Sequence, residues 1–132
     1  VMKKLDEGER DIKLSFDQYP YGAGSTTFSV ILPPWAHDGG ADQCLLRLAD
    51  EAERQRMKRD IVNGIPGWDN FIDFAGMENI LVTFVKTPKN ADLVGKNMIE
   101  IGEIRGREPL DAAFDLLLQE DLAVGLVDFY GL

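Results

Sequence analysis

The chain contains few of the side chains that build metal centres and disulfides. Its 132 residues include one cysteine, Cys44, and one histidine, His37. A single cysteine excludes an internal disulfide and favours a reducing compartment. A usual zinc site needs several converging His, Cys, Asp or Glu ligands, and the sequence has neither a His-x-His nor a Cys-x-x-Cys pair. We therefore expect no usual zinc site built from these residues alone.

Positive charge and long apolar runs are also scarce. The 14 Lys and Arg residues are outnumbered by 23 Asp and Glu residues, which gives a net charge of −9. This excess of negative charge argues against nucleic acid and anionic membranes as partners. No apolar run approaches membrane-spanning length, and no signal peptide is visible. The sequence predicts a soluble, cytoplasmic protein.

Four of the 14 basic residues lie in one short stretch. Arg54, Arg56, Lys58 and Arg59 lie in a segment of helical periodicity and are flanked by the acidic residues Glu51, Glu53 and Asp60. Such a mixture is typical of a solvated helix face with many salt bridges, and we prefer that interpretation to a nucleic-acid site.

The apolar fraction of 45% is enough for a buried core, and its periodicity indicates both strands and helices. Strands are predicted at 12–16, 27–32, 79–86 and 124–130, with a possible short strand at 68–74. Residues 79–86 are so uniformly apolar that we expect burial on both faces. Helices are predicted at 41–63, with a possible break near Asp50, at 97–106 and at 109–118. This alternation predicts an α/β protein, or α+β for the isolated piece.

Local signals also predict how the later helices begin and end. Asn97 and Glu100 have the spacing of a capping box at a helix start. Gly106 can end that helix in a left-handed conformation, and Pro109 suits the first turn of the next one.

Phenol and hydroxyl side chains gather in the stretch 17–27. Two tyrosines flank Pro20, and a predicted Gly-Ala-Gly turn leads to three consecutive hydroxyl residues. At the end of a strand this composition suits a binding or catalytic rim, although a tight loop would look similar.

Other candidate groups have simpler interpretations. We expect Cys44 to be a small buried apolar residue rather than a nucleophile, and His37 to face solvent. Asp17 and Asp128 lie at apparent strand ends, where each could be a ligand, a base or a structural cap. Taken alone, the residues indicate a binding site without a recognisable set of catalytic residues.

Several motifs nevertheless resemble the N-acyl-D-amino-acid deacylases, or D-aminoacylases, in the order and spacing of that family over nearly the whole chain. The motifs are Phe16-Asp17-Gln18-Tyr19-Pro20-Tyr21-x-Ala23-Gly24-Ser25-Thr26, Leu32-Pro33-Pro34-Trp35-Ala36, Gly95-Lys96-Asn97-Met98-x-Glu100-Ile101, Arg105-Gly106-x-Glu108-Pro109-Leu110-Asp111-Ala112 and Asp115-Leu116-Leu117-Leu118.

The resemblance implies a fragment of a zinc-dependent (β/α)8 barrel of the amidohydrolase superfamily, with an inserted small subdomain. Residues 1–32 would supply a barrel strand and a substrate-facing loop, 33–108 the lid-like insert, and 109–132 a barrel helix and the following strand. The motifs that carry the family's zinc ligands are not in this sequence, and Cys44 does not match the ligand cysteine. No metal ligand is therefore expected here, and zinc would bind elsewhere in the parent enzyme.

The resemblance also implies substrate contacts. Tyr19 matches the catalytic tyrosine that donates to the scissile acyl carbonyl. Ser25 and Thr26 match hydroxyl positions near the substrate carboxylate, and Phe129 and Leu132 fall where the family lines its side-chain pocket. The substrate would be a small N-acyl-D-amino acid, hydrolysed to a carboxylate and a D-amino acid by the parent enzyme, with the isolated chain inactive.

Two alternatives stay open. The chain could be an independently folding interaction or oligomerisation module that associates through exposed strand edges. It could also belong to an amidohydrolase that acts on another amide, because a fold does not fix its substrate.

Overall fold

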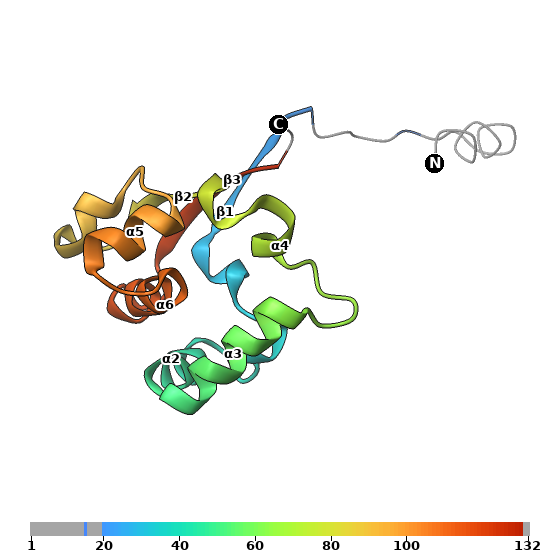
Figure 1. Ribbon diagram of the computed structural model, residues 1–132, viewed down its shortest axis with the longest axis vertical. Coiled ribbons are helices and arrows are strands. Elements are labelled where there is room, and N and C mark those ends of the chain that lie inside the picture. The colour runs from blue at the N-terminus through green and yellow to red at the C-terminus, as the bar shows by residue number, and fades with distance from the viewer. Residues whose placement is uncertain (1–14, 16–19, 131–132) are drawn as a thin grey trace, which may run out of the picture.

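A computed structural model describes Ser15 and residues 20–130 of the chain (Figure 1). The strands are β1 (Ala23–Thr27), β2 (Ile80–Val85) and β3 (Val124–Phe129). The α-helices are α2 (Ala41–Ala49), α3 (Glu51–Asn63), α4 (Phe71–Ala75), α5 (Met98–Arg105) and α6 (Pro109–Gln119). Four 3-10 helices connect them: η1 (Phe28–Ile31), η2 (Pro34–His37), η3 (Met77–Asn79) and η4 (Pro88–Leu93).

The three strands form one antiparallel sheet in the order β1-β3-β2. Ala23 pairs with Phe129 across β1 and β3, and Asp128 pairs with Ile80 on the other side. The last strand of the chain therefore lies in the centre, with both edges occupied. The expectation of an α+β fold for the isolated piece is confirmed, whereas the α/β alternative would need parallel strands, which the described residues do not form.

One face of this sheet carries the core. Ile80, Val82, Val124 and Leu126 are buried on it, in the alternation that a half-buried strand requires. Figure 1 shows α5 and α6 side by side next to the sheet, α2 and α3 paired at one end of the molecule, and α4 close to β3. The core draws on residues from all three predicted segments, 1–32, 33–108 and 109–132.

The helix ends confirm several local predictions. The helical segment 41–63 breaks at Asp50, whose side chain accepts a 2.9 Å hydrogen bond from the Glu53 amide and so caps α3. Asn97 and Glu100 form the predicted capping box of α5, with both hydrogen bonds at 2.9 Å. Gly106 ends α5 with a φ of 62°.

Three strand predictions are wrong. Within the predicted strand 27–32, Thr27 ends β1 and Phe28–Ile31 form the 3-10 helix η1, because a single tight turn buries Phe28 and Ile31 together. Ala23 and Gly24 of the expected Gly-Ala-Gly turn are instead the first residues of β1. Residues 68–74 enter α4, since the Asn70 side chain caps a helix there. β2 is not buried on both faces, because its Thr83 and Phe84 are exposed. The predicted strand 12–16 lies outside the described residues.

The basic residues of α3 form salt bridges, as predicted, but they are not all exposed to solvent. Arg54 is only 6% exposed and pairs with Asp115 of α6 at 2.8 Å. Lys58 contacts Asp111 and Glu108 at 2.7 and 3.2 Å, so that α3 is tied to the start of α6. These contacts give two of the four cations a structural role.

Gly102 of α5 is a further packing constraint, and replacing it with alanine is expected to destabilise the fold. Alanine in a helix is normally better than glycine by about 1 kcal/mol. Here a Cβ would lie 2.9 Å from the Arg107 carbonyl oxygen and 3.1 Å from the Cα of Pro109. We therefore expect Gly102→Ala to lower the free energy of unfolding by about 1–3 kcal/mol. Urea denaturation of this variant beside the exposed Glu103→Ala checks it, and equal or higher stability of Gly102→Ala would contradict it.

The longest described helix, α3, has 13 residues. None of the described helices has the length and apolar character needed to cross a membrane.

Candidate functional site

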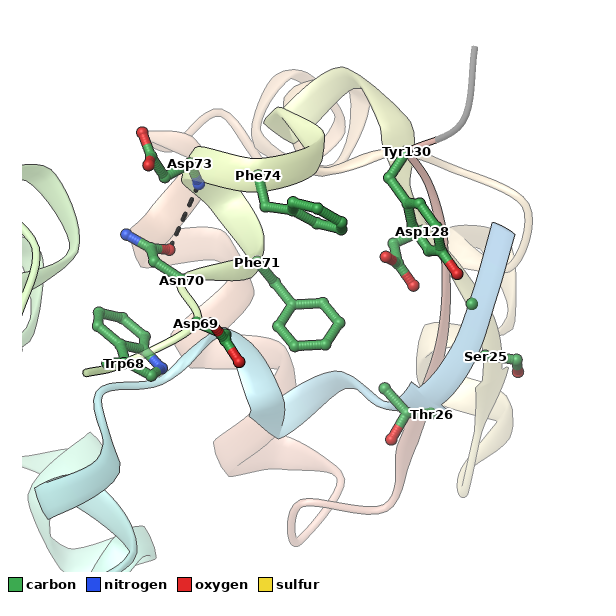
Figure 2. Close-up of a pocket in the computed structure, with 11 residues that line it drawn as sticks. Ser25, Thr26, Trp68, Asp69, Asn70, Phe71, Asp73, Phe74, Asp128 and Tyr130 are labelled. Atoms are coloured by element: carbon green, nitrogen blue, oxygen red, sulfur yellow. Dashed lines mark hydrogen bonds between the residues drawn. The ribbon is translucent and has the colours of Figure 1, made fainter. Parts of the chain in front are cut away.

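A pocket of about 750 Å³ opens between the sheet and α4 (Figure 2). Three residues of β1 (24–26) border it on one side, and residues 68–71, 73 and 74 border it on the other. Asp128, near the end of β3, and Tyr130, just after it, complete the lining. The pocket thus joins three segments that are far apart in sequence.

Asn70 fixes the wall formed by α4. Its Oδ1 accepts hydrogen bonds from the amides of Ile72 and Asp73 at 3.1 and 3.4 Å, and its Nδ2 donates to the Ile61 carbonyl at 2.7 Å. The side chain is 8% exposed. Because both ends of this side-chain amide are hydrogen-bonded to backbone groups, it holds α4 against the end of α3 and positions the aromatic residues that follow.

Aromatic rings form much of the pocket lining. Trp68, Phe71 and Phe74 come from the α4 side, and Tyr130 comes from the end of β3. The Phe74 and Tyr130 rings lie 5.0 Å apart between centroids, tilted by 38°. Phe74 remains 62% exposed, so its ring forms an outer border of the pocket.

Asp128 is the unusual polar residue of this pocket. It is 1% exposed, on the same sheet face as the apolar core residues Ile80 and Leu126. Neither carboxylate oxygen has a hydrogen-bond partner among the described residues. Burial raises the pKa of this carboxyl above its ordinary value. In Figure 2 the carboxylate points into the space bordered by Phe71, Phe74 and Tyr130.

Gly24 makes room for that carboxylate from the facing strand. It pairs with Asp128 in the β1–β3 ladder. A Cβ on Gly24 would lie 2.8 Å from Asp128 Oδ1 and 3.3 Å from a ring carbon of Tyr130. Only glycine fits at this position without a shift of either side chain.

The predicted substrate residues divide between the two faces of the sheet. Thr26 lies on the pocket side, whereas Ser25 points away from it (Figure 2) and its Oγ donates to the Leu126 carbonyl at 3.2 Å. Phe129 is 36% exposed and lies on the same face of the sheet as Ser25. Ser25 pairs with Val127, and Val127 and Phe129 share a face because they are two residues apart in β3. Tyr19 and Leu132 lie outside the described residues.

The other singled-out groups agree with their predictions. Cys44 is fully buried, and burial raises the pKa of its thiol, as expected for a core residue and not for a nucleophile. His37 is exposed, with Nε2 3.1 Å from the Ser29 carbonyl oxygen. Within residue 15 and residues 20–130, no three His, Cys, Asp or Glu side chains are grouped to hold a metal ion.

Sequence reasoning missed the aromatic side of the pocket. Residues 68–74 are visibly rich in aromatics, but a strand pattern would have sent Phe71 and Phe74 to opposite faces. Asn70 is a residue type that caps helix starts, and Phe71 and Phe74 follow it three residues apart. In a helix that spacing places both rings on one side, and this was the signal that could have predicted the wall. Comparison with known proteins finds no matching family model, no matching curated protein and no matching solved structure.

Proposed function

We propose that the chain is part of a zinc-dependent amidohydrolase that hydrolyses N-acyl-D-amino acids to a carboxylate and a D-amino acid. The observation that carries this proposal is the pairing of Ala23 with Phe129. It joins the two segments of the chain to which the family resemblance assigns substrate contacts. Tyr19 precedes Ala23 by four residues, and Leu132 follows Phe129 by three.

Ser25 and Phe129 are the described residues that best fit this role. They lie on one face as diagonal neighbours, because Ser25 pairs with Val127 and Phe129 pairs with Ala23. A hydroxyl beside an apolar ring suits a substrate that carries a carboxylate and a side chain. The Thr26 side chain lies on the opposite face, so it cannot contact the same substrate group as Ser25.

The sheet supports a larger insert than the one predicted at 33–108. Neighbouring strands of a (β/α)8 barrel are parallel. β3 is instead antiparallel to both of its neighbours, and both of its edges are occupied. In this proposal residues 23–129 form the inserted subdomain, and the barrel strands belong to other parts of the parent enzyme.

The zinc of the proposed parent enzyme does not fit the residues described here, which hold no group of three suitable ligands. In this proposal the metal and its chemistry belong to the rest of the parent enzyme. The residues of this chain bind and orient the substrate at the rim of that centre.

The test is release of D-methionine from N-acetyl-D-methionine by the parent enzyme, with N-acetyl-L-methionine as the stereochemical control. We expect Phe129→Ala to raise KM about tenfold with little change in kcat, because it removes a binding contact. Phe84→Ala is the matched control, since Phe84 is another exposed phenylalanine of the same sheet, 58% exposed. Equal effects of the two substitutions would overturn the role of Phe129.

The 132-residue chain with added zinc is assayed beside the parent enzyme. We expect no turnover from the short chain. Turnover by the short chain would overturn the assignment of the catalytic machinery to the rest of the enzyme. Inactivity of both proteins would remove the substrate assignment itself.

A further inference from the structure

The pocket beside α4 contains a buried acid for which the fold has no evident use. Both oxygens of Asp128 lack a hydrogen-bond partner among the described residues, although the residue is 1% exposed. An isolated ionised carboxylate is costly in apolar surroundings. An apolar side chain at this position would suit the core face of β3 better. A polar group that enters the pocket could supply the hydrogen-bond partner that the carboxylate lacks.

The charge of the pocket selects the sign of that group. The charged side chains that line it are all acidic: Asp69, Asp73 and Asp128. No lysine, arginine or histidine is among the lining residues. The whole chain carries a net charge of −9, which adds to the negative potential. An anion would be repelled here, and a cation would be attracted.

The aromatic rings select the kind of cation. The rings of Phe71, Phe74 and Tyr130 border the space into which the acid points, and Trp68 lines the pocket farther away (Figure 2). Aromatic faces attract organic cations and contact their apolar bodies at the same time. A bare metal ion would want several oxygen ligands, and the described residues offer no such group. The geometry therefore favours a cationic nitrogen on an apolar stem.

We propose that this pocket binds an organic cation, an alkylammonium group, with Asp128 as its counter-ion and the rings of Phe71, Phe74 and Tyr130 around its stem. Gly24 keeps the place of the counter-ion free, because a Cβ there would lie 2.8 Å from Asp128 Oδ1. Phe74, which is mostly exposed, lies at the outer border of the pocket. The proposal is independent of the deacylase assignment, which concerns the other face of the sheet.

The ammonium group has two possible sources. It can belong to a free alkylamine or to a lysine side chain on a peptide. Both present the same nitrogen and the same apolar stem to Asp128, and they differ in what the stem is attached to outside the pocket.

The probe is n-butylammonium chloride, titrated into the 132-residue chain at constant ionic strength and followed by NMR. We expect saturable shifts of the Trp68 indole and of the amides of residues 71–74. The neutral analogue n-butanol should bind about tenfold more weakly or worse, because it cannot pair with a carboxylate. Equal affinities for n-butylammonium and n-butanol in the unmodified chain would overturn the proposal without any mutation.

Two substitutions test the assigned residues. Asp128→Asn is nearly isosteric and should weaken n-butylammonium binding about tenfold or more. Its melting temperature should be no lower than that of the unmodified chain, because the carboxylate makes no hydrogen bond within the described structure. Gly24→Ala should weaken binding to a similar degree with the charge of Asp128 intact. Glu103→Gln, on the exposed surface of α5, is the control and should bind as the unmodified chain does. Unchanged affinity in Asp128→Asn would overturn the assignment.

A third titration separates the sources. Nα-acetyl-lysine N-methylamide carries the same butylammonium stem on a peptide-like frame. Binding about tenfold tighter than n-butylammonium indicates a lysine of a peptide as the natural occupant, because the frame then adds contacts. Equal or weaker binding indicates a free amine. Both results depend on binding and not on turnover, so they stand apart from the outcome of the deacylase assay.

Discussion

Replacing Arg54 with alanine is expected to lower the free energy of unfolding by about 2–4 kcal/mol. The side chain is buried between α3 and α6. Its Nε donates to the Leu48 carbonyl at 2.6 Å, and a guanidinium nitrogen lies 2.8 Å from Asp115. The guanidinium also lies over the Phe114 ring, 5.9 Å from its centroid. Alanine would leave the Leu48 carbonyl without this donor and open a cavity beside Phe114.

Arg59→Ala is the matched control for this prediction. It removes the same side chain from the same helix, at an exposed position, and should change stability by less than about 0.5 kcal/mol. Urea denaturation followed by circular dichroism measures both variants. Arg54→Lys should recover only part of the loss, because an ammonium lacks the planar fork that reaches both partners. A loss in Arg54→Ala no larger than in Arg59→Ala would show that the buried arginine has no structural role.

Glu120 is expected to give the second large effect, a loss of about 2–4 kcal/mol on substitution by alanine. This carboxylate is 0% exposed, just after α6. It accepts hydrogen bonds from the Thr87 amide, the Thr87 hydroxyl and Asn90 Nδ2, each at 2.6 Å. These bonds hold the segment after β2 against the end of α6. Removing the acid would leave three donors without that acceptor.

The same carboxylate makes stability depend on pH. Burial raises the pKa of Glu120, but the hydrogen bonds from Thr87 and Asn90 outweigh it, and the pKa is lowered overall. A lowered folded-state pKa contributes stability above the unfolded value of about 4.3, and that contribution is lost as pH falls through the folded value.

Glu120→Gln provides the measurement. The stability difference between the unmodified chain and this variant should be largest near neutral pH and should shrink as the solution is acidified below about pH 4. Glu103→Gln, an exposed change on α5, should show no such trend. A difference that stays constant from neutral pH to acid would mean that the charge of Glu120 does not matter.

The parts of the fold that the sequence predicts are those with local causes. Asn97 and Glu100 cap α5 through atoms three residues apart, and Asp50 breaks the long helical segment for the same reason. Residues 28–31 show the limit of such reasoning. Their β-branched and aromatic character suits a strand, but the need to bury Phe28 and Ile31 on one side decides for a turn of 3-10 helix.

The candidate pocket was less predictable, because it depends on strand register. The sequence marks Asp128 as a polar residue at a strand end and leaves its role open. Only the pairing of Gly24 with Asp128 shows that the acid is buried and that a glycine makes room for it. The exposure of Arg54 was misjudged in the same way, since its partner Asp115 lies on a different helix.

The antiparallel pairing of β1 with β3 has a consequence for the evolution and engineering of this unit. Ala23 and Phe129 are ladder partners, and the Tyr130 amide donates to the Gly22 carbonyl at 3.1 Å. The unit formed by residues 22–130 therefore begins and ends on neighbouring strands that lie roughly 5 Å apart. A host protein can gain or lose such a unit with little disturbance, because the two attachment points are already as close as the ends of a hairpin turn. The same proximity makes the unit suited to circular permutation, with a short loop joining Tyr130 to Gly22 and new termini opened at an exposed turn such as Gly64–Gly67.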